Sequence, residues 1–176
     1  MDLKFYGHQD AAEIRTMLLD IHDAVYEDEG EDAGDAFHST ERFGGFVDRW
    51  SSRDGWVCVV GFEDGEAVGF AYGAAFSTGG WWRGSERPTS LAPEDRVFAL
   101  SELMVLRRWR KTGASVALHE ALIGDRPEKA VTLFVDRSHP KVQALYETWG
   151  YEQVDEAKPY EDSPTYAVMM KRLAGR

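Results

Sequence analysis

The chain is poor in cysteine, in basic residues and in long apolar runs, and each shortage excludes a class of protein. Cys58 is the only cysteine in 176 residues, so no disulfide can form within the chain, which favours a cytoplasmic location. There are 20 Lys and Arg against 31 Asp and Glu, and the net charge of −11 argues against nucleic-acid partners and anionic membranes. No apolar run approaches the length of a membrane-spanning helix, and residues 1–10 lack the basic and apolar parts of a signal peptide.

The rest of the composition is that of a folded α/β protein. Hydrophobic residues make up 43% of the chain, which is long enough for one domain over residues 1–176. The apolar patterns follow the order strand, two helices, a strand meander, a strand–helix–strand crossover, a helix and two strands. Such a crossover predicts two parallel strands within a largely antiparallel sheet.

The patterns also predict where each element lies. The expected strands are Leu3–Tyr6, Trp56–Phe62, Ala67–Ala75, Phe98–Val105, Ala130–Asp136, Tyr151–Glu156 and Tyr166–Leu173. Helices are expected from Ala11 to about Tyr26 after a cap at Asp10, from Ser39 or Thr40, from Thr112–Ser115, and from Pro140 to Trp149. The first of these helices has an apolar stripe of Ile14, Met17, Leu18, Ile21 and Val25, and the run Glu63-Asp64-Gly65-Glu66 indicates a tight hairpin between two strands.

The stretch Phe98–Ile123 carries the strongest chemical signal. It predicts a buried strand, an elbow with one glycine, and an apolar helix. Four cations lie within the elbow: Arg107, Arg108, Arg110 and Lys111. Thr112 or Ser115 can cap the helix, and amides and cations at a helix start favour a phosphate group. The alternative is an ordinary turn with a solvated basic face.

The residues after Val105 keep a regular spacing. Arg110 lies five residues after Val105, and Gly113 lies three residues after Arg110. This spacing resembles the phosphate loop of the GNAT superfamily of N-acetyltransferases, Gln/Arg-x-x-Gly-x-Gly/Ala, which follows a strand valine in the same way. The chain departs from that pattern at Ser115, where glycine or alanine is usual, and at Arg107, where proline is frequent.

A second motif lies downstream in the order that the family has. The chain reads His139-x-x-Val142-x-x-Leu145-Tyr146-x-x-x-Gly150-Tyr151. It resembles the family form Asn-x-x-Ala-x-x-Leu-Tyr-x-x-x-Gly-aromatic, with histidine and valine in place of the usual asparagine and alanine. The two motifs cover about the second half of the chain.

The resemblance implies a fold and a co-substrate. The fold is a central mixed, mostly antiparallel sheet of about seven strands flanked by about four helices, with a parallel β-α-β crossover. The co-substrate is acetyl-CoA, its pyrophosphate on the amides of Lys111–Ser115 and its pantetheine arm along the backbone of Leu103–Val105. The residues assigned to acetyl-CoA are Leu103, Met104, Val105, Arg110, Lys111, Thr112, Gly113, Ala114, Ser115 and His139.

Two side chains are candidates for proton transfer. Tyr146 holds the position at which many family members carry the general acid that protonates the leaving thiolate; the alternative is an aromatic that packs its helix onto the sheet. An attacking amine has a pKa near ~10 and must lose a proton, which Glu102 on the central strand can take. The alternative for Glu102 is a salt bridge to Arg96 or Arg110.

The resemblance implies an N-acetyltransferase that moves an acetyl group to a primary amine by direct attack in a ternary complex. The acidic run Glu27–Asp35 and the negative charge favour a small cationic acceptor, although a solvated loop is the simpler interpretation of that run. Trp81 and Trp82 can form an acceptor wall or a homodimer contact. A protein or peptide acceptor and a non-catalytic acyl-CoA-binding domain stay open as alternatives. The histidines have no ligand spacing, so no metal is expected.

Overall fold

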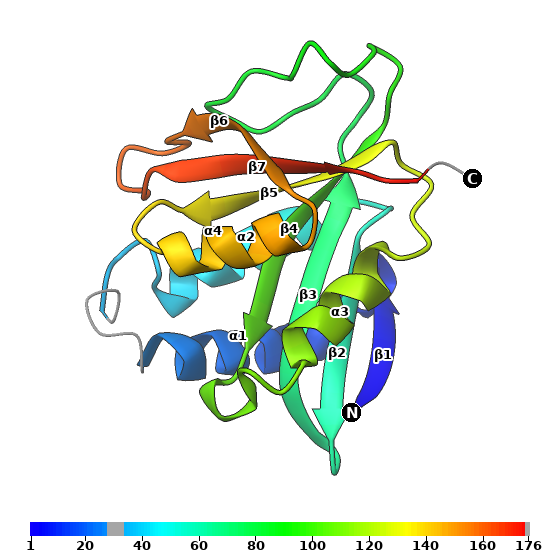
Figure 1. Cartoon of the computed structure of the whole chain (residues 1–176). Helices are drawn as coiled ribbons and strands as arrows, with labels where there is room; N and C mark the ends of the chain where they lie inside the picture. Colours follow the sequence, from blue (N-terminus) through cyan, green and yellow to red (C-terminus); the bar gives the residue numbers. More distant parts are fainter. Residues whose placement is uncertain (28–33, 175–176) are drawn as a thin grey trace. The chain divides into compact units, whose positions relative to one another are not determined.

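The computed structural model describes residues 1–27 and 34–174, which form one seven-stranded sheet with the strand order β1-β2-β3-β4-β5-β7-β6 (Figure 1). The strands are β1 (Asp2–Gly7), β2 (Val57–Glu63), β3 (Glu66–Ala75), β4 (Val97–Val105), β5 (Ala130–Asp136), β6 (Glu152–Ala157) and β7 (Tyr166–Arg172). The helices are α1 (Ala11–Glu27), α2 (Thr40–Ser51), α3 (Ala114–Ile123) and α4 (Pro140–Thr148), with 3₁₀ turns η1 (His8–Asp10) and η3 (Arg107–Trp109).

The sheet is mixed, as the sequence predicts. Strands β4 and β5 pair in parallel, with Val97 beside Ala130. The pairs β1–β2, β2–β3, β5–β7 and β6–β7 are antiparallel. The helix α3 lies between β4 and β5 in the chain, so the predicted parallel crossover is confirmed.

The chain divides into two compact units that are not contiguous in sequence. The first unit comprises Met1–Ala74 and Ser101–Asp125, and the second comprises Ala75–Leu100 and Arg126–Arg176. Strand β4 therefore contributes residues to both units.

In the first unit, α1 and α2 cover one face of the strands and α3 contacts β2 from the other (Figure 1). Ile14, Leu18, Ile21 and Val25 recur at helical spacing and are all buried, so they form the face of α1 that packs on the sheet. From α2, Phe43 and Val47 join the same core, which also contains Met104 of β4.

Helix α1 begins at Ala11, as predicted, but its cap differs from the prediction. Asp10 was expected to cap a helix beginning at Ala11, but the 3₁₀ turn η1 precedes α1 and the Asp10 carboxylate accepts from the Gly7 amide at 2.8 Å. The cap therefore acts one turn earlier, since the chain is already helical at His8. For α2 the prediction is confirmed, because Ser39 is the N-cap and its hydroxyl accepts from the Arg42 amide.

The β2–β3 hairpin turns at Asp64 and Gly65, as its sequence indicates. Both residues have a positive φ, 49° and 82°. A two-residue turn of that kind matches the right-handed twist of the strands it joins, and it favours glycine at the second position.

In the second unit, β5 pairs with β7, β7 pairs with β6, and α4 packs on β5. Pro140 occupies the first turn of α4, where its missing amide hydrogen costs nothing. The helix ends at Thr148, one residue before the prediction, and Gly150 follows with a φ of 93°.

Candidate functional site

The elbow after β4 contains a 3₁₀ turn that the sequence did not predict. η3 spans Arg107–Trp109, and the chain then passes through Lys111 at a φ of 62° and Gly113 at a φ of 89° before α3 begins. Positive φ at Gly113 is a conformation that side chains with a Cβ rarely adopt. The first amides of α3 have no acceptor within the helix, and they follow directly after the exposed Gly113.

The side chains of the elbow divide into pinned and exposed groups. The Arg108 guanidinium contacts the Glu66 carboxylate at 2.7 Å, so part of its charge is neutralised within the first unit. Arg110 turns back, and its Nε donates to the Val105 carbonyl at 3.4 Å. Arg107 and Lys111 are exposed. The elbow is therefore cationic at its surface although the chain as a whole is acidic.

The capping residue of α3 is not the one that the sequence suggested. Gly113 is the N-cap, and it has no side chain with which to bind the free amides. The Thr112 hydroxyl instead donates to the Trp109 carbonyl, which closes the end of η3. Because neither Thr112 nor Ser115 is the N-cap, no side-chain cap of the kind predicted occupies the amino terminus of α3.

The end of β4 packs closely on β3. Leu106 donates its amide to the Val68 carbonyl at 2.9 Å, and a Cβ added to Gly69 would lie 2.4 Å from the Met104 carbonyl oxygen. A side chain at position 69 would therefore push β4 away from β3. Leu103 is partly buried, and Met104 and Val105 are buried, so this part of β4 is held firmly.

Glu102 lies on β4 in the first unit, next to these residues. It keeps some contact with solvent, but the protein around it desolvates the carboxylate and raises its pKa to about 8. Within the described part of the chain Glu102 forms no ion pair, and burial is the cause of the shift. The salt bridge to Arg96 or Arg110, which the sequence left open, is therefore not formed there.

Tyr146 lies on α4 in the second unit, where it is buried and held by two aromatic neighbours. Its ring meets the rings of Trp149 and Tyr151 edge to face, with centroids 5.2 Å and 5.5 Å apart. The Tyr146 carbonyl accepts from the amides of both residues. The ring of Tyr146 thus packs against the aromatic residues that follow α4.

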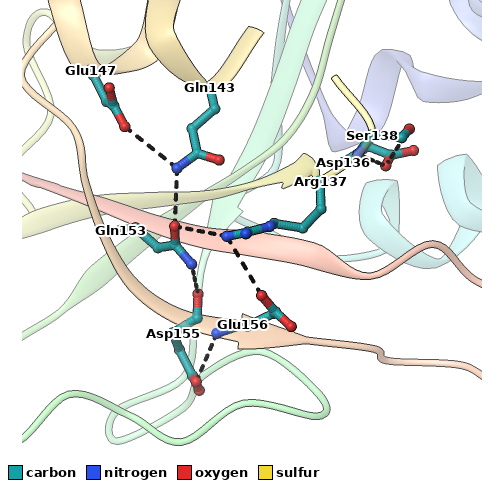
Figure 2. Close-up of polar contacts among 8 residues, drawn as sticks. All are labelled: Asp136, Arg137, Ser138, Gln143, Glu147, Gln153, Asp155 and Glu156. Carbon is teal, nitrogen blue, oxygen red and sulfur yellow. Dashed lines mark hydrogen bonds and ion pairs between the residues drawn. The ribbon is translucent and has the colours of Figure 1, made fainter. Parts of the chain in front are cut away.

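A polar network ties α4 to β6 (Figure 2). The Gln143 side chain donates to Gln153 Oε1 at 3.0 Å, and Arg137 donates to the same oxygen at 3.2 Å. Arg137 also lies 3.5 Å from the Glu156 carboxylate. These groups are exposed, so each contact stabilises the fold only slightly, but together they restrict the orientation of the helix that carries Tyr146.

His139, which the sequence assigned to acetyl-CoA, lies in the second unit at the amino terminus of α4. It is exposed and occupies the N-cap position without a side-chain cap bond. Its Nε2 lies 3.9 Å from the Asp136 carboxylate, whose other oxygen accepts from the amide and hydroxyl of Ser138. Asp136 thus shapes the turn that leads into α4.

The two tryptophans of the long loop are partly buried anchors. Trp81 Nε1 donates to the Ser85 hydroxyl at 3.0 Å, and Trp82 Nε1 donates to the Thr132 hydroxyl at 2.9 Å. The Trp82 ring also stacks on Phe134 of β5 at 4.4 Å. Both indoles therefore stabilise the loop within the second unit, a role that the sequence did not indicate.

Most of the acidic run Glu27–Asp35 lies outside the described residues, which exclude 28–33. At its end, Asp35 accepts from the Phe37 amide at 3.1 Å and lies 3.2 Å from His38 Nδ1. This carboxylate is thus engaged in the turn before α2.

Residues 1–27 and 34–174 contain neither a cluster suited to a metal ion nor a helix suited to a membrane. No group of three or more His, Cys, Asp or Glu residues in them is arranged to hold a metal ion. None of the helices among them is long and apolar enough to cross a membrane.

The predicted site residues divide between the two units. The first unit holds Glu102, Leu103–Val105 and Arg110–Ser115, and the second holds His139 and Tyr146. Sequence reasoning missed Gly69 and Tyr72 on β3, beside the end of β4. Both lie within the strand predicted at Ala67–Ala75, but that prediction gave no sign of their neighbours on β4.

Comparisons with known proteins give consistent results. The model of the acetyltransferase (GNAT) family matches residues 14–151. A ribosomal-protein-alanine N-acetyltransferase from Brucella melitensis is similar with a TM-score of 0.65 and 17% identity, over 98% of this chain and 100% of that one. PaiA N-acetyltransferase from Thermoplasma acidophilum, crystallised in complex with coenzyme A, has a TM-score of 0.59 and 14% identity over 98% and 100%.

An aminoglycoside acetyltransferase from an uncultured soil metagenomic sample has a TM-score of 0.57 and 21% identity over 93% of this chain and 97% of that one. At these identities the solved structures establish the fold alone. A search of curated proteins finds no significant match.

Proposed function

Because the chain belongs to the GNAT acetyltransferase family, we propose that it transfers an acetyl group from acetyl-CoA to the primary amine of a small cationic acceptor. The observation that carries the proposal is the family match over residues 14–151, which spans the elbow and α4. The acyltransferase class follows from the family, whereas the acetyl donor, the amine and the order of steps are the proposal.

The elbow supports the donor half of the reaction. The amides of Lys111–Ser115 would hold the pyrophosphate, since the start of α3 is uncapped by any side chain and Gly113 there is exposed. Arg110 adds positive charge beside it, and the backbone of Leu103–Val105 would pair with the pantetheine arm. His139, the N-cap residue of α4, would also contact acetyl-CoA.

Glu102 supports the acceptor half. An ammonium group with a pKa near ~10 gives up its proton more readily to a carboxylate of pKa about 8 than to an ordinary glutamate. In the proposed step Glu102 takes a proton from the ammonium group, the free amine nitrogen bonds to the acetyl carbonyl carbon, the carbon–sulfur bond breaks, and the second nitrogen proton passes to solvent. Tyr146 then donates a proton to the departing thiolate, which leaves as CoA.

The acceptor is proposed from charge. The chain carries a net charge of −11, which favours the approach of a cation. Peptide or protein amines are the alternative, and the neighbouring structures include both a ribosomal-protein-alanine and an aminoglycoside acetyltransferase. Those names describe the neighbours, so the acceptor panel has to include both classes.

The test is thiol release from acetyl-CoA with a panel of polyamines, aminoglycosides, amino acids and peptides with free amino termini. The expected result is CoA release with at least one small cationic amine, and loss of that release in Glu102→Gln. Turnover only with peptides would replace the small acceptor by a peptide or protein. Binding of acetyl-CoA without turnover across the panel would favour a non-catalytic acyl-CoA-binding domain.

A further inference from the structure

Tyr72 on β3 has a fully buried hydroxyl that the fold does not pair. The side chain is completely inaccessible, and within the described part of the chain its Oη has no hydrogen-bond partner. The indole Nε1 of Trp56 is likewise buried and unpaired, and the two rings lie 5.6 Å apart. Nearly all buried polar atoms in native proteins have a hydrogen-bond partner, so two neighbouring buried atoms without one need an explanation.

The β3–β4 pairing places Tyr72 beside Glu102. Val68 accepts from Leu106, and Gly69 lies against Val105. Continued along antiparallel strands, this register brings Tyr72 opposite Glu102, whereas the Phe76 amide, which donates to the Val97 carbonyl, sets a register that brings Tyr72 opposite Ser101. The register therefore shifts by one residue along the pair, and both residues lie beside Tyr72.

The electrostatics agree with this placement. The Tyr72 phenol has a strongly raised pKa, chiefly because it is buried and then because the Glu102 charge opposes its ionisation. The Ser101 hydroxyl lies close enough to lower that pKa, but outside direct hydrogen-bond geometry. The remaining titratable neighbour is Cys58 on β2, whose thiol stays neutral because burial raises its pKa.

The groups around Tyr72 match what a buried water requires. A buried water makes about three hydrogen bonds to polar groups that are otherwise unsatisfied. The unpaired Tyr72 hydroxyl has the Ser101 hydroxyl and the Glu102 carboxylate as polar neighbours, and the three residues lie on two adjacent strands of one unit. A ligand cannot contact the Tyr72 hydroxyl directly, since the residue is inaccessible.

We propose that Tyr72 is a positioning residue for Glu102, acting through one buried water that it shares with Ser101. The water donates to the ionised carboxylate and holds it in one orientation. This inference deepens the proposed function, because it concerns the base assigned there, but the contact itself does not depend on catalysis. The Tyr72 hydroxyl stays protonated throughout, and only Glu102 gains or loses a proton.

The direct test is a titration of the Glu102 carboxyl carbon by NMR in protein labelled at glutamate. The Glu102→Gln variant identifies the signal. Loss of the water-mediated bond in Tyr72→Phe should raise the Glu102 pKa by roughly half to one unit, because the ionised form loses support. Phenylalanine preserves the ring and its packing on Trp56 and Phe70, so the fold should survive.

Two further variants make the test specific. Ser101→Ala should shift the same signal in the same direction, and it serves as the test should Tyr72→Phe not fold. Tyr6→Phe, which removes a phenol on β1, should leave the Glu102 titration unchanged. The proposal would be overturned if the Glu102 pKa were unchanged in folded Tyr72→Phe. Where that variant does not fold, an unchanged Glu102 pKa in Ser101→Ala would have the same meaning.

Kinetics separate this inference from the proposed function. In an active enzyme the acid limb of the kcat/KM profile should move in Tyr72→Phe by the same interval as the NMR pKa, whereas a purely structural role would lower the rate at every pH. If no acceptor is turned over, the proposed function fails while the NMR shift still decides the role of Tyr72.

Discussion

The desolvation of Glu102 should make the stability of the protein depend on pH in a way that one substitution abolishes. In Glu102→Gln the carboxylate becomes an amide of nearly the same shape that does not titrate. Burial raises the pKa of Glu102 from its ordinary value of 4.5 to about 8 in the folded protein. Between those values the folded state keeps a proton that the unfolded state has lost.

The sign and size follow from this proton. Below pH 4.5 both states are protonated, and the protonated Glu102 makes its full contribution to the free energy of unfolding. That contribution is lost as the pH rises from 4.5 through about 8, and above this range the free energy no longer changes through Glu102. At about 1.4 kcal/mol per pKa unit, the shift sets an upper limit of about 5 kcal/mol. Glu102 keeps some contact with solvent, so we expect about 2–3 kcal/mol of unfolding free energy.

The assay is urea unfolding of the wild type and Glu102→Gln at several pH values from 5 to 9. The variant should gain stability relative to the wild type as the pH rises. Other titrations, such as that of buried His22, whose pKa is lowered chiefly by burial, occur in both proteins and cancel in the difference. The exposed Glu94→Gln serves as the matched control and should show no such trend.

A difference between the wild type and Glu102→Gln that is the same at pH 5 and pH 9 would refute the reasoning. It would mean that the carboxylate is well solvated or paired in the folded protein.

Three further predictions concern the site and its support. Gly69→Ala should destabilise the protein by roughly 1–3 kcal/mol in urea unfolding, because its Cβ would meet the Met104 carbonyl. Gly45→Ala, at an exposed position of α2, should be neutral or stabilising. Equal effects of the two substitutions would contradict the close packing of β3 on β4. Tyr146→Phe should lower kcat by about 10²-fold with KM for acetyl-CoA unchanged in steady-state assays, and full activity would remove Tyr146 from proton transfer. Ser115→Gly, which restores the usual family residue, should keep or strengthen acetyl-CoA binding in calorimetry, while a large loss would show that the serine takes part in binding.

The sequence predicted the elements well where one physical signal dominates. The apolar stripe of α1, the Asp64–Gly65 turn and Pro140 each act locally, so periodicity and turn chemistry located them within one or two residues. The first residue of α1 was predicted but its cap was not, because Asp10 is compatible with a cap in either of two adjacent turns.

The site was predictable only in part. The spacing from Val105 to Gly113 is a property of the chain and indicated the elbow. The turn η3 and its end instead depend on hydrogen bonds that Thr112 donates to Trp109 and Arg110 donates to Arg107. The surroundings of Glu102 come from residues far away in sequence. Tyr72 looks like any other aromatic in a buried strand until β3 and β4 are paired.

The discontinuity of the two units has a consequence for synthesis. The core of the first unit includes Met104, and the unit itself extends to Asp125, so a ribosome that has released only residues 1–74 has not supplied all of it. The apolar faces of α1 and α2, including Phe43 and Val47, therefore stay exposed until β4 emerges. We therefore expect nascent chains that stop near residue 100 to be held by chaperones, and release to follow once the segment through α3 has left the ribosome.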